Sequence, residues 1–223
     1  MPERPYRYAV IPTYNRPDIL LRALAAACAE ADRVFVIDNG DDPDLEAPRG
    51  DGWYVLGVPM RPPNLSKLWN IGINLAAEHA YMRRAEQWDV AVLNDDAIIP
   101  PGWFTAVSTQ MRNWEAAAGS SGLGASTGAY VHRTPGTTAL PLRLQGHAFI
   151  LKGEAHLRAD ERLEWWCGDN DLDMQARRAG GTVIIGGWPV EHLHPDQSTR
   201  GELAAQTGVD MATFVDKWGW RPW

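Results

Sequence analysis

The acidic cluster of Asn94, Asp95 and Asp96 contains the side chains of this sequence that are best suited to do chemistry. Adjacent carboxylates offer the oxygen donors that Mg²⁺ and Mn²⁺ prefer, and such sites commonly use one or two side chains together with phosphate and water. A cation held there could stabilise the charge that develops on a departing diphosphate. The alternative is that these carboxylates only cap a helix or start the turn at residues 100–102.

Two histidines, His192 and His194, could add one imidazole ligand to such a metal site. Alternate residues of an extended segment share a face, and neutral imidazole is a common metal ligand. We favour His194, because it precedes a proline and the polar residues 196–199. The alternative is a surface pair that contacts only solvent.

A second group of carboxylates, Asp169 and Asp171, falls at the start of a helix predicted over residues 169–179. A carboxylate held near a reacting hydroxyl can serve as its general base. Either residue could instead be a helix N-cap, and for Asp171 that interpretation is at least as good.

Aromatic side chains could form the wall of a sugar-binding site. The sequence has eleven tryptophans, some of them in loop-like stretches such as residues 165–166 and 218–220. Trp165, Trp166 and His147 offer flat faces of the kind that pack on the C–H groups of a sugar. Packing in the core is the alternative for each of them.

The elements that must position these residues alternate between strand and helix in the first half of the chain. Apolar patterns predict helices that begin at Pro17 and Leu65, buried strands at residues 8–12 and 34–37, and further strands at residues 53–58 and 90–93. This alternation predicts an α/β fold, a Rossmann-like and mainly parallel central sheet flanked by helices. Ligands bind beyond the carboxyl ends of such strands, where the polar residues 13–15, 38–40 and 94–96 should gather.

The second half of the chain has a less regular pattern. It predicts strands at residues 146–151 and 182–185 around the helix over residues 169–179. The stretches 119–128 and 133–141 could be mobile acceptor-side loops or plain connections, and we favour connections.

Length and composition predict one ordinary globular domain. With 223 residues, 45% hydrophobic and 22% charged, the chain can bury a single core. Its net charge of −7 argues against a broad electrostatic grip on nucleic acid or on an anionic membrane. We find no signal peptide and no apolar run of the ~18 residues that a membrane span needs, and therefore expect a cytoplasmic protein. Cys28 and Cys167 should be reduced thiols.

Five motifs, taken in chain order, resemble those of family 2 glycosyltransferases, enzymes of the GT-A fold that generally invert the anomeric centre. They lie at residues 10–16, 36–40, 64–72, 93–97 and 168–180. The resemblance covers nearly the whole chain and implies one GT-A domain over residues 1–223. Within it, residues 1–97 would form a nucleotide-binding half and residues 98–223 an acceptor-binding half.

The resemblance also implies roles for single residues. Thr13 and Asp38 match positions that contact the nucleotide base, Asp96 matches a metal ligand, and Asp169 matches the catalytic base. Gly168 would lie on the acceptor side, together with His147, Trp165 and Trp166. The implied donor-binding residues are Pro12, Thr13, Tyr14, Asn15, Arg16, Asp38, Asn39, Asn64, Lys67, Asn70, Asn94 and Asp95.

Three positions depart from the family pattern. Trp69 stands where the family has arginine, Asn94 where it has the first aspartate of an Asp-x-Asp motif, and Gly168 where it has glutamate. The asparagine can still ligate a cation through its carbonyl oxygen, so the motif is weakened rather than lost.

Taken together, the motifs predict inverting transfer of a sugar from a UDP- or dTDP-sugar to an acceptor hydroxyl, assisted by Mn²⁺ or Mg²⁺, with Asp169 as the base. The acceptor would be a glycan, a protein or a small glycoside, and less readily a modified nucleic acid. One alternative is a nucleotide-sugar or glycan-binding module that kept the fold and lost turnover, which the three departures motivate. Another is a sugar-phosphate nucleotidylyltransferase, whose glycine-rich N-terminal loop is missing after Pro12.

Overall fold

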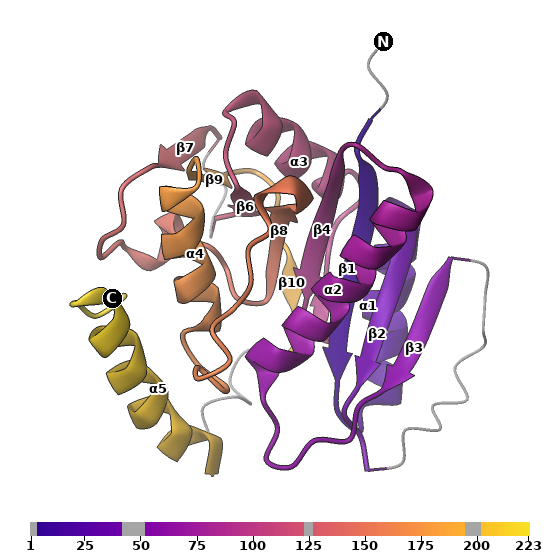
Figure 1. Ribbon diagram of the computed structural model, residues 1–223. Coiled ribbons are helices and arrows are strands. Elements are labelled where there is room, and N and C mark those ends of the chain that lie inside the picture. The colour runs from indigo at the N-terminus through magenta and orange to yellow at the C-terminus, as the bar shows by residue number, and fades with distance from the viewer. Residues whose placement is uncertain (1–3, 42–51, 123–126, 195–201) are drawn as a thin grey trace.

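One eight-stranded β-sheet, with helices on both faces, forms the centre of the protein (Figure 1). The computed structural model describes residues 4–41, 52–122, 127–194 and 202–223. In the order in which they lie side by side, the strands are β3 (Trp53–Gly57), β2 (Arg33–Asp38), β1 (Tyr6–Thr13), β4 (Trp88–Leu93), β8 (Ala148–Lys152), β6 (Ala118–Ser121), β9 (Thr182–Ile185) and β7 (Ala129–His132).

The strands β3, β2, β1 and β4 run parallel to one another. Both faces of β1 are buried. Tyr8 and Val10 belong to the core cluster under α2 (Leu65–Arg83), whereas Ala9 and Ile11 belong to the cluster under α1 (Pro17–Glu30). A strand covered on both faces has a continuous apolar sequence, which is why β1, β2 and β4 were predictable. The predicted α/β fold with its flanked central sheet is confirmed.

The other side of the sheet is mixed. β8 runs antiparallel to both β4 and β6, β9 lies parallel to β6, and β7 runs antiparallel to β9. Because the chain direction reverses at β8 and reverses back at β6, the carboxyl ends of β6 and β9 lie at the same edge as those of β1 and β4.

The prediction that residues 119–128 form a connection is wrong for the strand β6, which lies inside the sheet. Residues 123–126 of that stretch are outside the described residues. The composition misled because β6 is packed too closely for large side chains. A β-carbon at Gly119 would come within 2.8 Å of Val183 in β9 and 3.0 Å of Val107. Small residues are therefore required here by packing, although they are typical of loops.

Two helices were not predicted, α3 (Trp103–Asn113) and α5 (Glu202–Trp218). The turn expected at residues 100–102 is the start of α3, with Gly102 at its N-cap in a left-handed conformation (φ 84°). Trp218, which we placed in a loop-like tail, is the last residue of α5 and is buried. The predicted helix over residues 169–179 is α4 (Gly168–Arg178), and α5 packs on it through a third hydrophobic cluster.

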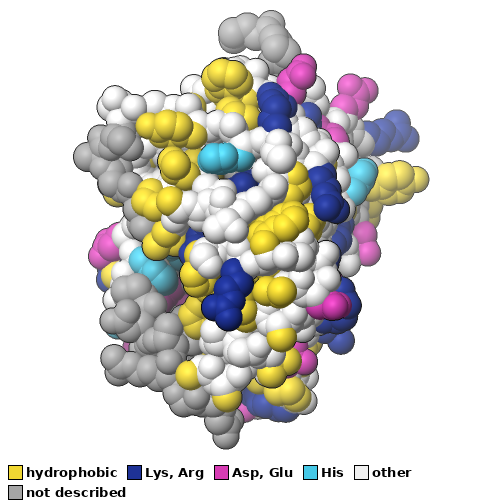
Figure 2. All heavy atoms as spheres, turned by 90° about the vertical axis from the view of Figure 1, so that its left-hand side faces the viewer, with side chains coloured by type: hydrophobic (Ala, Val, Ile, Leu, Met, Phe, Trp, Pro, Cys, Tyr) yellow, Lys and Arg dark blue, Asp and Glu magenta, His cyan; other side chains and the backbone are white. Residues whose placement is uncertain are grey.

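The remaining short elements are two single-turn 3₁₀ helices and a two-stranded sheet. They are η1 (Leu140–Leu142), η2 (Gly153–Ala155), β5 (Ala97–Ile98) and β10 (Glu191–His192). The face with α4 and α5 presents hydrophobic side chains interspersed with lysine and arginine (Figure 2). Across the described ranges, every helix is too short or too polar to cross a membrane.

Candidate functional site

The carboxyl ends of β1, β2 and β4 bring the predicted polar residues to one edge of the sheet. Thr13 lies beside Asp38 in the parallel register of β1 and β2, and the Asn39 N–H donates to the Thr13 carbonyl at 2.9 Å. From the same strand end, the Thr13 hydroxyl donates to Asp95 Oδ2 at 2.9 Å. The sequence motifs of β1, β2 and β4 therefore meet in space.

The carboxylates of Asp95 and Asp96 are almost fully buried, with 2% and 3% of each residue exposed. Arg16, just before α1, pairs with both: its guanidinium lies 2.8 Å from Asp95 and 3.7 Å from Asp96. Burial raises the pKa of Asp95, although Arg16 and Thr13 oppose that rise. Burial would also raise the pKa of Asp96, but His192 and Arg16 outweigh it and hold that pKa below its usual value.

His192 is the histidine that reaches the acidic cluster. β10 pairs antiparallel with β5, which sets His192 opposite Ala97, and the Leu193 N–H donates to the Asp96 carbonyl at 3.0 Å. The His192 Nε2 atom then lies 3.3 Å from Asp96 Oδ1. His194 is exposed, and nothing in the described part of the chain joins its ring to Asp96. The preference for His194 as a metal ligand stays an untested prediction, whereas the register of β10 places His192 beside the cluster.

The separation of His192 Nε2 from Asp96 Oδ1 fits a shared cation. Two neighbouring ligands of an octahedral ion lie about 3.0 Å apart when each is about 2.1 Å from it. In the described ranges, no group of three or more histidine, cysteine, aspartate or glutamate side chains is placed to hold a metal. Asp96 and His192 could together supply two ligands of a cation, and phosphate or water oxygens would have to complete its coordination.

His147, predicted on the acceptor side, stacks on His192. The two rings are nearly parallel, with an angle of 12° and centroids 4.7 Å apart. Burial lowers the pKa of His147 to about 4, so its ring is neutral near pH 7. Its backbone carbonyl also accepts a hydrogen bond from the Asn94 N–H at 2.9 Å. His147 therefore connects the acidic cluster with the start of β8.

Asp169, the predicted base, lies beside Gly146, the residue that precedes His147. It stands in the first turn of α4, and its Oδ2 atom would be 2.8 Å from a β-carbon at Gly146. Asn170 donates to Asp169 Oδ1 at 2.6 Å. Burial raises the pKa of Asp169, partly offset by Asn170 and by the positive charge of Arg143. A continuous path, from Asp96 through His192, His147 and Gly146, thus ends at the Asp169 carboxylate.

Gly168 and Trp69, two of the positions that depart from the family pattern, are in contact. A β-carbon at Gly168 would come within 2.6 Å of Ser66 Oγ and 3.0 Å of the Trp69 ring. Trp69 is buried, and its ring meets Phe149 edge-on with centroids 5.4 Å apart.

Tyr14, Asn15 and Asp41 form a polar group with Arg61 beyond the ends of β1 and β2. The Tyr14 hydroxyl and the Asn15 amide donate to Asp41 at 3.2 and 2.7 Å. Arg61 pairs with Asp41 and lies over the Tyr14 ring, 5.0 Å from its centroid. Arg61 and Asp41 were not predicted as site residues, because neither lies in a motif and their contact depends on the path of the loop after β3.

Two residues predicted to bind the donor, Asn64 and Asn70, make structural hydrogen bonds. Asn64 caps α2 by accepting from the Lys67 N–H at 2.8 Å. The Asn70 side chain donates to the Ala159 carbonyl and accepts from its N–H, both at 2.9 Å. The two bonds between Asn70 and Ala159 fasten the segment before α4 to α2. The Lys67 side chain itself is exposed.

Of the two adjacent tryptophans before α4, Trp166 packs against α5. The Trp166 indole donates to the Leu203 carbonyl at 3.3 Å, and its ring packs on the cluster that includes Cys167 and Phe214. Trp165 is half-buried. The alternative that Asp171 is a helix cap is wrong, since Cys167 occupies the N-cap and Asp171 lies inside α4.

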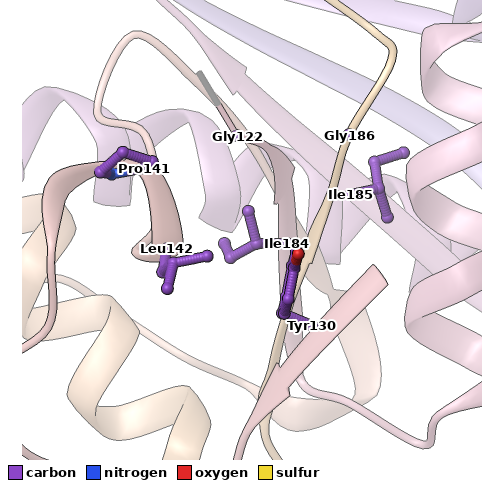
Figure 3. Close-up of a pocket in the computed structure, with 7 residues that line it drawn as sticks. All are labelled: Gly122, Tyr130, Pro141, Leu142, Ile184, Ile185 and Gly186. Carbon is purple, nitrogen blue, oxygen red and sulfur yellow. The ribbon is translucent and has the colours of Figure 1, made fainter. Parts of the chain in front are cut away.

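A small cavity of about 70 Å³ lies at the carboxyl ends of β6 and β9 (Figure 3). Tyr130, Leu142 and Ile184 are among the residues that line it. It has room for a few waters or a small aliphatic group. Two of the lining residues, Gly122 and Pro141, come from the stretches that we had interpreted as connections, whereas Ile184 and Ile185 belong to the strand predicted over residues 182–185.

Comparison with known proteins places this site on a known fold. No family model matches the chain, and no curated protein matches it. Among solved structures, S. aureus TarS 1–349 superposes with a TM-score of 0.61 and 13% identity, over 96% of this chain and 72% of that one. TarS is a staphylococcal glycosyltransferase of GT-A type.

The chain has the GT-A fold. The same TarS fragment in complex with UDP-GlcNAc superposes with a TM-score of 0.57 and 13% identity, over 97% of this chain and 73% of that one. A longer TarS chain gives the same score and identity, with 44% of its length covered. At this identity the likeness concerns the fold, and the chemistry has to be argued from the residues.

Proposed function

We propose that the protein is an inverting glycosyltransferase that moves a sugar from a nucleotide-diphosphate donor to an acceptor hydroxyl. The observation that carries the proposal is the path of contacts from the buried Asp95–Asp96 pair, through His192 and His147, to Asp169. It joins a pair of diphosphate-side carboxylates to a candidate base at one edge of a GT-A sheet.

Asp169 would take the proton of the acceptor hydroxyl. A general base works best when its pKa lies closer to the working pH, and burial moves the pKa of Asp169 in that direction. In the single displacement that we propose, the acceptor oxygen attacks the anomeric carbon as the nucleotide diphosphate leaves, which inverts the configuration of that carbon. The acceptor would be a glycan, a protein or a small glycoside, and a modified nucleic acid is less favoured by the net charge of −7.

Asp96 and His192 would hold Mn²⁺ or Mg²⁺, which when bound stabilises negative charge on the donor diphosphate. Arg16 would add a fixed positive charge at the same place, since it already lies against both carboxylates. Asn94 and Asp95 would complete the diphosphate side of the site, and His194 would stay outside it.

Thr13 and Asp38 would face the nucleotide base, with Pro12, Tyr14, Asn15 and Asn39 around them. The complex of TarS with UDP-GlcNAc supports a UDP-sugar as donor. A dTDP-sugar is the second choice, because a pyrimidine offers the same edge to Asp38. In this proposal residues 1–97 serve the nucleotide and residues 98–223 serve the acceptor.

A binding module that lost turnover is the main alternative, and the altered positions Trp69, Asn94 and Gly168 favour it. In that case UDP-GlcNAc would bind in the presence of Mn²⁺ without any release of UDP. A nucleotidylyltransferase is a weaker alternative, and it would release pyrophosphate from a sugar-1-phosphate and a nucleoside triphosphate.

Thermal unfolding with UDP-GlcNAc, with and without Mn²⁺, tests donor binding, because a ligand of the native state raises the midpoint temperature. Release of UDP from UDP-GlcNAc, with and without a pool of acceptors, tests turnover. We expect Asp96→Ala to lose the Mn²⁺-dependent shift, and Asp169→Asn to keep the shift and lose UDP release. Glu78→Gln, on the exposed face of α2, is the matched control. If Asp169→Asn releases UDP as fast as that control, Asp169 is not the base.

A further inference from the structure

A buried carboxylate on α5, Asp210, holds the loop that leads into Asp169. Its Oδ2 atom accepts hydrogen bonds from the N–H groups of Trp165 and Trp166 at 2.8 and 2.6 Å. Its Oδ1 atom accepts from the N–H of Glu164 at 3.2 Å and from the Gln206 side chain at 2.9 Å. Asp210 has no exposed surface. A carboxylate that gathers three consecutive amides by charge-assisted hydrogen bonds fixes the backbone there.

Helix α2 holds the same loop from its other side. The Leu65 N–H donates to the Glu164 carbonyl at 2.6 Å, and the Ser66 hydroxyl donates to the Leu163 carbonyl at 2.5 Å. The loop is therefore fixed between α2 and α5 through both its N–H and its carbonyl groups.

Cys167, at the end of this loop, has a left-handed backbone with φ of 64° and ψ of 1°. A residue other than glycine is strained there, and the conformation persists only where surrounding contacts impose it. The Cys167 carbonyl accepts from the Asp171 N–H at 2.8 Å, which closes the first turn of α4. The backbone angles of Cys167 thus set the direction in which α4 starts and in which the Asp169 side chain points.

Helix α5 also holds α4 on the far side of Asp169. Asp171 is fully buried, and its Oδ1 atom lies 2.7 Å from Lys217 Nζ and accepts from the Trp218 indole at 2.9 Å. Figure 1 shows α5 lying alongside α4. Asp210 therefore holds the loop that precedes Asp169 in the chain, whereas Lys217 and Trp218 hold Asp171, which follows it.

We propose that Asp210 is a positioning residue for Asp169: by binding the amides of residues 164–166 it holds Cys167 in its left-handed conformation and so aims the Asp169 carboxylate at Gly146. This inference rests on the proposed function, in which Asp169 is the base. It gives α5 a part in proton removal, through the position of the Asp169 carboxylate.

The test is UDP release from UDP-GlcNAc by the full chain, with kcat and KM measured separately. Asp210→Asn replaces an acceptor with an N–H donor that faces backbone N–H groups. We expect kcat to fall about 10- to 100-fold, as a small misplacement of a catalytic group does, with the KM for UDP-GlcNAc unchanged. Asp216→Asn, the same substitution at an exposed position of α5, should leave both constants unchanged.

Cys167→Gly provides a rescue that a general loss of packing would not show. Glycine adopts the left-handed conformation without strain, so it no longer needs Asp210 to hold it. The double variant Asp210→Asn with Cys167→Gly should recover most of the lost kcat. If Asp210→Asn does not fold, Gln206→Met takes its place, since it removes only the side-chain donor to Asp210, and the same fall in kcat at constant KM is expected to a smaller degree.

Several outcomes would overturn the inference. The first is a folded Asp210→Asn variant, or Gln206→Met in its place, whose kcat equals that of Asp216→Asn. The second is a fall in kcat in Asp210→Asn that the added Cys167→Gly substitution does not reduce. Asp169→Asn in the same assay separates the two proposals. Turnover by Asp169→Asn, or none by the wild type, refutes the assignment of the base and the positioning role with it. If Asp169→Asn is inactive and Asp210→Asn is fully active, only the positioning role fails.

Discussion

The indole ring of Trp69 packs directly on Gly168, where a β-carbon would come within 3.0 Å of the ring. In the family 2 glycosyltransferases that the motifs resemble, arginine and glutamate stand at these two positions. The departures are therefore not independent, because a buried tryptophan on α2 leaves no space for a side chain at the start of α4. The contact between Trp69 and Gly168 lies directly before Asp169 in the chain.

Restoring glutamate at Gly168 alone should destabilise the protein. Its β-carbon would clash with Ser66 Oγ at 2.6 Å and with Trp69, and overpacking of this kind costs about 1 to 3 kcal/mol. Trp69→Arg alone should also destabilise, since it removes a buried ring. The double variant should lose less unfolding free energy than the two single losses add up to. Urea unfolding of the wild type, the two single variants and the double variant can measure this difference. If the two losses of unfolding free energy simply add in the double variant, positions 69 and 168 are independent and this interpretation is wrong.

The fold was predictable where a buried strand carries large apolar side chains. The apolar runs at residues 8–12, 34–37 and 90–93 all fall in central parallel strands, β1, β2 and β4. β6 was missed because close packing on β9 and α3 selects Gly119 and its small neighbours, which look like a loop in sequence. α5 was missed because its buried residues, among them Phe214 and Trp218, pack on α4 rather than on the sheet.

The candidate site was predictable to the extent that it lies at strand ends. Residues such as Thr13, Asp38 and Asp95 follow apolar strands, and parallel strands bring such ends together. The choice of His192 over His194 depends instead on how β10 pairs with β5, and a two-residue strand has no periodic pattern to reveal its register. The hydrogen bonds of Asp210 to the loop before α4 depend in the same way on tertiary packing.

Gly72 allows α2 to approach β1, so that Gly72→Ala should destabilise the protein. A β-carbon there would lie 2.2 Å from Val10 Cγ1. Alanine favours a helix over glycine by about 1 kcal/mol, but the clash should outweigh it at about 1 to 3 kcal/mol. Urea unfolding should show a net loss of unfolding free energy in Gly72→Ala. The double variant Gly72→Ala with Val10→Ala should lose less, because the side chain that clashes is gone. Gly208→Ala on α5, with nothing within 4 Å, is the control and should stabilise by about 0.5 to 1 kcal/mol.

Substitution of the two histidines should separate their roles in metal binding. His192→Ala removes an atom 3.3 Å from Asp96 Oδ1, whereas His194→Ala changes an exposed side chain. We expect the stabilisation of the UDP-GlcNAc complex by Mn²⁺ to be lost in His192→Ala and kept in His194→Ala. Addition of EDTA to the wild type should remove the same stabilisation. Equal Mn²⁺-dependent shifts in the two variants would exclude His192 as a ligand.

The pH dependence of turnover should report the environment of Asp169. A base must be unprotonated to act, so the rate falls as the pH drops through its pKa. Burial raises the pKa of Asp169, so this fall should begin at a higher pH than for an exposed aspartate, whose pKa is about 3.9. The charges that act on this carboxylate are Arg143, which lowers its pKa, and Asp173, which raises it. Arg143→Met should therefore move the acid limb of the kcat profile for UDP release to higher pH, whereas Arg143→Lys should leave it in place. An acid limb at the same pH in wild type and Arg143→Met would show that another group limits the rate.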